Sequence, residues 1–343
     1  MESPEATPTL IELRLFDMHP AFSVIFLTTL IGLGQGLFLA LFTGQIYSLA
    51  RLLPAQSSAE FYALGALVAL VLLVAGLGAS FFHLGRPERA WRSASQWRSS
   101  WLSREVIVLP LFMALVFLYG LMHFIGWTQP LFVVAGTLAV DLTLLIGLLG
   151  TIAAFALFVC TAMIYASVKF LQEWHTPLTV VNYTFFGLAS GFMLAAAFSA
   201  FNGIGLVTFY ATWAVVFTLI AALGRVATLI RNRRLRPKID LTSAIGVRHP
   251  QSAQLTQGFM GGAFNTREFF HRKSAFFVNS TRRAFLLLVF IVPMALIGAS
   301  YFLQSELLPM VAFAVQYVGL LAERWYFFAE AKHPQNIYYQ QIA

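Results

Sequence analysis

The sequence predicts an all-α integral membrane protein with eight transmembrane helices and both termini in the cytoplasm. The first observation is composition: 59% of the 343 residues are hydrophobic and only 10% are charged, more apolar than one soluble core of this length. The second is a series of uncharged windows, each long enough for the roughly 20 residues that cross a bilayer. The third is that cationic residues gather in alternate connections, as the positive-inside rule requires.

The helices follow from these windows in chain order. The clearest spans contain no Asp, Glu, Lys or Arg and lie at 21–50, 61–82, 106–126, 142–168 and 284–305. The window 177–224 is about twice one span, and Asn202 and Gly203 near its middle predict a helical hairpin. The last span, 306–328, carries Glu323 and Arg324 near its end. Small residues at four-residue intervals in the first span predict close helix packing: Gly32, Gly36, Ala40 and Gly44.

These spans divide the chain into five segments. We expect a cytoplasmic N-terminal segment at 1–20, six helices within 21–230, a cytoplasmic loop at 231–283, two helices within 284–328 and a cytoplasmic tail at 329–343. The first segment is mainly acidic, whereas a cleavable signal peptide begins with positive charge, so we expect the first span to remain attached.

One further apolar run, at 131–140, raises the question of a ninth span. With eight spans, every Lys and Arg except Arg51 and Arg225 belongs to the termini, connections and helix ends of one side. A ninth span would divide these cations between the two faces of the membrane. We therefore expect the run to belong to a long or interfacial helix, with the cation-rich side in the cytoplasm.

The composition also excludes several kinds of site. The single cysteine, Cys160, cannot form a disulfide framework, ligate an iron–sulfur cluster or build a thiolate zinc site within this chain. The formal net charge of +8 indicates orientation in a membrane protein rather than binding of nucleic acid.

The densest set of polar side chains joins the second and third helices. A site for a lipid-dissolved quinone needs hydrogen-bond donors, titratable groups for two protons and an apolar slot open to lipid. The candidate quinone-binding residues are His83, Arg86, Trp97, Trp101 and Glu105. The alternative is structural, with polar helix ends and arginines that hold lipid phosphates, and spacing alone favours this alternative.

Few other polar groups in or near the spans require an explanation. Arg225 and Glu323 both lie near the inner ends of their helices, and we expect them to form a structural ion pair. Asp141 is expected to cap the fourth helix. A haem b would need two histidines at similar depth, which only His19 and His83 could provide, and no other metal site is expected.

Several distinctive blocks in one order carry a resemblance to a known family. They are HPAFS at 19–23, HLGRPERAW at 83–91, SWLSRE at 100–105, FLQEWHTPLTVVNY at 170–183, GFMGGAFNTREFFH at 258–271 and ERWYFFAEAKHPQNIYY at 323–339. The chain resembles the DMSO reductase anchor-subunit family of eight-helix membrane proteins. Within it, the chain is most similar to the membrane subunits of cytoplasmic sulfite dehydrogenase complexes.

The resemblance implies an anchor that reacts with quinone but not with sulfite itself. In the family, the anchor exchanges electrons with an iron–sulfur subunit joined to a molybdopterin catalytic subunit, and it binds ubiquinone or menaquinone near the polar face. The family's quinone-site histidine and glutamate correspond to His83 and Glu105. Molybdopterin and iron–sulfur clusters then belong to the partners. The loop at 231–283 is expected to dock the iron–sulfur subunit on the cytoplasmic side of a bacterial inner membrane.

Two other functions stay open at the level of sequence. The anchor of another molybdenum enzyme, acting on DMSO, polysulfide, tetrathionate or arsenic oxyanions, would have similar helices. A secondary transporter would show internal repeats and broken polar helices near the midplane, and the sequence has neither.

Overall fold

The structure, a computed structural model, describes residues 22–82, 84, 86–134, 138–203, 205–236, 246 and 274–331. Within these residues, eight helical stretches are long and apolar enough to cross a membrane. They are α2 (Phe22–Leu49), η1 with α3 (Ser58–Ala63, Leu64–Phe81), α4 (Trp101–Phe124), α5 (Leu142–Ala166), α6 (Pro177–Asn202), α7 (Val207–Arg233), α9 with η4 and α10 (Ala275–Leu286, Leu287–Ile291, Val292–Leu303), and α11 (Leu307–Glu330). The helical membrane architecture predicted from composition is therefore present.

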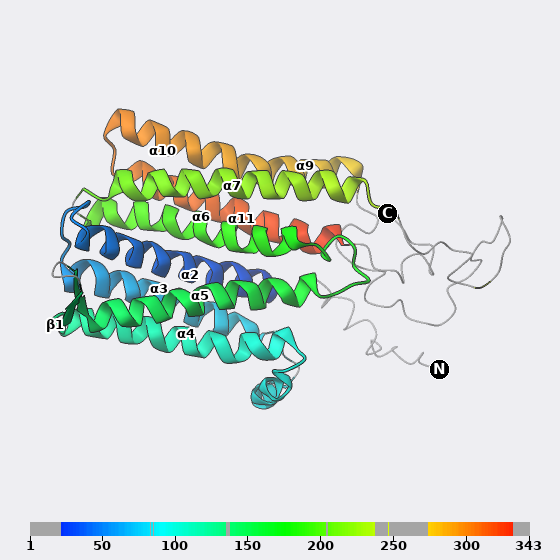
Figure 1. Ribbon diagram of the computed structural model, residues 1–343. Coiled ribbons are helices and arrows are strands. Elements are labelled where there is room, and N and C mark those ends of the chain that lie inside the picture. The colour runs from blue at the N-terminus through cyan, green and yellow to red at the C-terminus, as the bar shows by residue number, and fades with distance from the viewer. Residues whose placement is uncertain are drawn as a thin grey trace, which may run out of the picture.

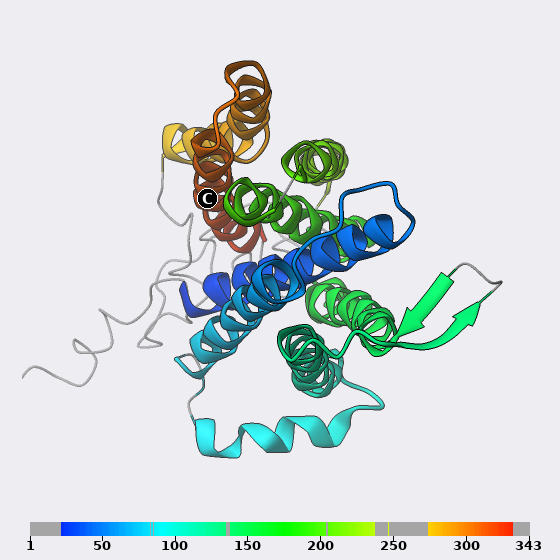
Figure 2. The same cartoon turned by 90° about the vertical axis from the view of Figure 1, so that its left-hand side faces the viewer.

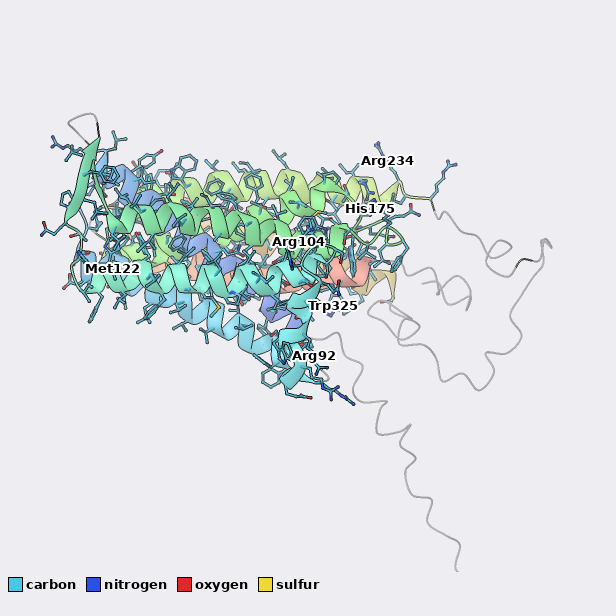
Figure 3. The ribbon with its side chains drawn as sticks, turned by 60° about the horizontal axis from the view of Figure 1, so that its bottom comes forward. Arg92, Arg104, Met122, His175, Arg234 and Trp325 are labelled. Atoms are coloured by element: carbon cyan, nitrogen blue, oxygen red, sulfur yellow. The ribbon has the colours of Figure 1, made fainter. Side chains whose placement is uncertain are left out.

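The helices lie side by side in one bundle, with α2 near its middle (Figures 1 and 2). α2 packs against α3 and α6, α6 packs against α7 and α11, and the α4–α5 pair forms the other flank. Figure 3 shows Arg92, Arg104 and Arg234 at one end of the bundle and Met122 at the other. We call these the basic end and the opposite end.

Capping side chains fix where several helices begin. Ser100, before α4, accepts a hydrogen bond from the backbone N–H of Ser103, and Asp141, before α5, accepts one of 2.9 Å from that of Leu144. Pro177 occupies the first position of α6. Each device suits a helix start, where backbone N–H groups have no partner within the helix. Asp141 therefore has the capping role expected of it.

α2 and α6 approach each other closely at paired glycines. A Cβ atom at Gly36 would collide with the backbone of Gly187 and Gly191, and one at Gly191 would collide with the backbone of Gly36. Only glycine permits this approach, because any larger residue adds an atom at Cβ. Of the small-residue stripe predicted in the first span, Gly32 and Gly36 face α6, and Gly44 faces Tyr210 of α7.

The described residues of the segment 131–140, which are 131–134 and 138–140, form strands, so the expectation of a long or interfacial helix was wrong. The chain forms two antiparallel strands, β1 (Pro130–Val134) and β2 (Leu138–Asp141), with Phe132 opposite Val140. Valine and phenylalanine favour extended backbone, and proline cannot donate within a helix, which accounts for the hairpin. The hairpin lies at the opposite end of the bundle (Figure 1) and adds no membrane span.

The seventh span begins before its uncharged window. α9 starts at Ala275, within the segment 231–283 assigned to the loop, and Ser274 caps it by accepting from the N–H of Phe277 at 3.2 Å. The charged first turns of α9 therefore extend the seventh helix at the basic end. Residues 237–245 and 247–273 of this segment lie outside the described part of the chain.

The α2–α6 contact predicts that Gly36→Ala destabilises the protein. The added methyl group must displace backbone rather than a flexible side chain, which costs roughly 1–3 kcal/mol. Gly298→Ala in α10 is the matched control, because a Cβ atom there meets nothing within 4 Å. Thermal unfolding in detergent should show a clearly lower Tm for Gly36→Ala alone, and equal Tm values for the two variants would contradict the packing.

Candidate functional site

Glu105 is a buried carboxylate near the start of α4, at the basic end. The residue is 8% exposed, and one carboxylate oxygen accepts a hydrogen bond of 2.5 Å from the hydroxyl of Thr161 on α5. Among the described residues, no Lys, Arg or His forms an ion pair with it within 4.0 Å. An ionisable group within a span that lacks a counter-charge is a default candidate for function.

The connection before α4 lies outside the bundle, across its basic end (Figure 3). Its main element is η2 (Pro87–Gln96), a 3₁₀ helix. Arg104 joins this connection to α4, because its guanidinium donates to the carbonyls of Trp97 at 2.9 Å and Arg98 at 2.8 Å. The same guanidinium stacks 4.2 Å from the ring centroid of Trp101. Trp97 and Trp101 are thereby held next to the helical turn that carries Glu105.

Of the other two predicted quinone-site residues, only Arg86 is described, and it is not brought to this turn. Arg86 is exposed and precedes η2, whose ten residues span on the order of 20 Å between Arg86 and Trp97. His83 lies outside the described residues, and so does His19, the other member of the haem pair considered above. Trp101 and Glu105 therefore share the first turns of α4, and the backbone of Trp97 is joined to these turns through Arg104.

An apolar groove lies between α2 and the end of α3 that reaches this connection. It has a volume of about 450 Å³, and its lining residues are Ser23, Phe26, Leu30, Ala75, Gly78, Ala79 and Phe82. That volume is within the range of small-molecule sites, and a Cβ atom at Gly78 would meet nothing within 4 Å. Phe82 is 88% exposed and immediately precedes residue 83. The groove is open and, apart from Ser23, is lined by apolar residues and glycine, so the contacts that it offers are hydrophobic.

Sequence reasoning did not find the groove, because its residues resemble ordinary lipid-facing residues. The available signal was the cluster of small residues near the end of α3: Ala75, Gly78 and Ala79.

A buried ion-pair network links α7 and α11 near the basic end. Arg225 Nε lies 2.9 Å from Glu323 Oε1, and Arg225 Nη1 lies 3.3 Å from Glu330 Oε2. Arg324 Nη2 lies 3.8 Å from the other oxygen of Glu323. The expected Arg225–Glu323 pair is therefore present, but Arg324 and Glu330 extend it. Glu330 follows Glu323 by seven residues, which places both on one face of the helix. This spacing could have predicted that Glu330 also pairs with Arg225.

A second polar cluster lies at the opposite end. His123 is 3% exposed, its Nδ1 lies 2.7 Å from the Ser58 hydroxyl, and the rings of Tyr62 and Tyr119 contact it. Between this cluster and Glu105, the inward face of α4 carries buried apolar side chains: Leu109, Phe112 and Val116. Along α4 the two polar regions are therefore separated by an apolar layer.

Comparisons with known proteins agree along nearly the whole chain. The family model described as DMSO reductase anchor subunit (DmsC) matches residues 18–324, a range that includes the residues from His83 to Glu323 discussed above. The chain is also similar to a sulfite dehydrogenase subunit of Allochromatium vinosum. The identity is 66% over 326 residues, which are 95% of this chain and 100% of that relative.

The ion-pair network predicts that Arg225→Ala is strongly destabilising. Arg225 is 1% exposed, and its loss leaves Glu323 buried without its closest cation, a change that typically costs about 3–5 kcal/mol. Arg233→Ala, exposed in the last turn of the same helix, should change stability by less than about 0.5 kcal/mol. Thermal unfolding in detergent compares the two, and similar Tm values would show that the network is not structural.

Proposed function

Because the chain belongs to the DMSO reductase anchor-subunit family, we propose that it is the membrane subunit of a sulfite-oxidising complex and delivers electrons to membrane quinone. The observation that carries this proposal is the 66% identity to the sulfite dehydrogenase subunit of Allochromatium vinosum over the full length of that relative. A molybdopterin subunit would oxidise sulfite, and an iron–sulfur subunit would bring the electrons to this chain.

The charge distribution supports a cytoplasmic position for the basic end. The described arginines outside the membrane-spanning helices gather there, apart from Arg51. Translocation of so many cations across a membrane held negative inside is unfavourable, which is the basis of the positive-inside rule. The partners, the quinone and the source of protons would then share one compartment.

The groove between α2 and α3 is the proposed place for the quinone ring. A bound quinone would supply two carbonyl oxygens that take up two electrons and two protons. Phe26, Leu30 and Phe82 would contact the ring and exclude water from it. His83, the residue after Phe82, would donate to a carbonyl oxygen, and Glu105, oriented by Thr161, would hold a proton at the basic end.

The apolar face of α4 supports proton exchange with the basic end alone. Leu109, Phe112 and Val116 offer no hydrogen-bonding group between Glu105 and the polar cluster around His123. A proton relay needs groups that can both accept and donate, and hydrocarbon side chains cannot. Quinone reduction with protons taken up from the basic end would move no net charge across the bilayer.

The segment 231–283 is the proposed docking site for the iron–sulfur subunit. Both of its described flanks lie at the basic end. Arg231, at the end of α7, donates to the carbonyl of Gln172 at 3.0 Å and so holds the point where the segment leaves the bundle. At the other flank, Phe276 in the first turn of α9 is 80% exposed. Aromatic side chains beside arginines are enriched at protein interfaces.

Glu105→Gln in the assembled complex tests the assignment. The amide keeps the size of the side chain but cannot transfer a proton, so quinone-coupled sulfite oxidation should fall about 100-fold. Sulfite oxidation with a soluble artificial electron acceptor should stay at the native rate, because the catalytic partner is unchanged. Glu60→Gln, exposed at the opposite end, is the matched control and should leave both rates intact. Native quinone turnover in Glu105→Gln would remove Glu105 from the site.

A further inference from the structure

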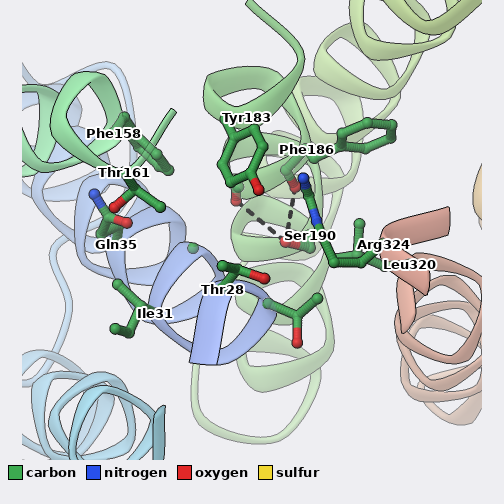
Figure 4. A pocket seen from close by; sticks show the side chains of 13 residues that line it. Thr28, Ile31, Gln35, Phe158, Thr161, Tyr183, Phe186, Ser190, Leu320 and Arg324 are labelled. Atoms are coloured by element: carbon green, nitrogen blue, oxygen red, sulfur yellow. Dashed lines mark hydrogen bonds between the residues drawn. The ribbon is translucent and has the colours of Figure 1, made fainter. Parts of the chain in front are cut away.

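A small enclosed cavity lies between α2, α5, α6 and α11, in the part of the bundle near Glu105 (Figure 4). Its polar lining residues are Thr28, Thr29, Gln35, Thr161, Tyr183, Ser190 and Arg324. The volume open to the centre of a water molecule is about 10 Å³, which is close to the space that one water needs. The cavity is therefore too small for a quinone but has room for one water.

The cavity wall contains one buried hydrogen-bond donor that has no acceptor among the described residues, Nε of Arg324. The hydroxyl of Tyr183 is also buried but has Tyr165 and Arg324 as hydrogen-bond partners. The Arg324 guanidinium stacks 3.8 Å from the centroid of the Tyr183 ring, so both groups lie on one side of the cavity, as Figure 4 shows. A buried donor without a partner costs about 1–3 kcal/mol, which makes an acceptor in the cavity favourable.

The facing wall contains two hydroxyl groups that already donate a hydrogen bond elsewhere. Thr161 donates to Glu105, and Thr28 donates to the carbonyl of Val24 at 2.9 Å. Each hydroxyl oxygen keeps lone pairs that can accept. A single water could therefore accept a hydrogen bond from Arg324 and donate one to Thr161.

We propose that this cavity binds one water molecule, which joins the Glu105–Thr161 pair to the Arg324–Glu323–Arg225–Glu330 network. Thr161 is then a positioning residue. Its hydroxyl accepts a hydrogen bond from the water and donates one to Glu105, and so orients the Glu105 carboxyl. Without the water, no direct hydrogen bond or ion pair among the described residues joins the Glu105–Thr161 pair to the ion-pair network of Arg324, Glu323, Arg225 and Glu330. With it, the one buried carboxylate in the described spans that lacks an ion pair is connected to the guanidinium of Arg324.

Gly32→Ala tests the water without altering any of its hydrogen-bonding partners. Gly32 lines the cavity, and an added Cβ atom would meet only the Cα of Gly187, at an ordinary 3.8 Å, so the methyl group occupies the space of the water without a clash. Gly298→Ala, where a Cβ atom meets nothing within 4 Å, is the matched control.

The readout is the infrared carboxyl band of the complex that Glu105→Gln removes. We expect Gly32→Ala to shift this band and Gly298→Ala to leave it at the native frequency. The same frequency in both variants would overturn the proposal.

Thr161 variants test the positioning role. Thr161→Val removes the hydroxyl at nearly constant volume and should shift the same band, whereas Thr161→Ser keeps the hydroxyl and should restore it. The consequence for turnover rests on the proposed quinone function: kcat for quinone should fall about tenfold in Thr161→Val and Gly32→Ala, as expected for one lost hydrogen bond. An unshifted band in Thr161→Val would reject the role of Thr161. Absence of quinone turnover in the native complex would reject the proposed function but not the bound water, because the infrared band can be measured in a complex that does not turn over.

Discussion

The free-energy cost of placing charge inside a bilayer is the constraint on which the rest of this structure depends. It explains why the described arginines outside the membrane-spanning helices gather at one end, apart from Arg51. It also explains why Arg225, which lies within a helix, is surrounded by Glu323, Glu330 and the rings of Phe285 and Tyr326. The described charges that are buried between α7 and α11, Arg225, Glu323 and Arg324, each have a charged partner. Glu105 departs from this pattern, since a hydroxyl and not a cation holds it.

The same constraint connects the fold to the proposed chemistry. The bundle has a polar region at each end, and along α4 an apolar layer separates the two. Glu105 lies on the side of this layer that faces the basic end. The apolar groove at the end of α3 opens at that end as well. An anchor that receives electrons from partners on one face needs a quinone slot, a proton-holding group and a docking surface there. In the proposed function, the groove would be the quinone slot, Glu105 would hold the proton, and the flanks of the segment 231–283 would border the docking surface.

Much of this arrangement was predictable from the sequence, because long uncharged windows and cation placement reflect the same membrane energetics that determine the fold. The spans, the cap at Asp141 and the Arg225–Glu323 pair follow from such patterns. Contacts between particular side chains were harder to predict, because they depend on how each helix is rotated about its axis. Examples are the contact of Arg225 with Glu330 and that of Thr161 with Glu105. The hairpin at β1 and β2 was missed because a short apolar run fits a helix or a strand, and its Val and Phe content was given too little weight.

The account depends most directly on the basic end and Glu105 lying on the cytoplasmic side. Its sharpest test is labelling of single cysteines with a membrane-impermeant maleimide, in a Cys160→Ala background that removes the one native thiol. Ser99→Cys lies in the exposed turn after η2, and Ala55→Cys lies in the exposed loop between α2 and η1 at the opposite end. The account predicts that Ser99→Cys is labelled only in inverted membrane vesicles and Ala55→Cys only in intact cells. The reverse pattern, or labelling of both from one side, would contradict it.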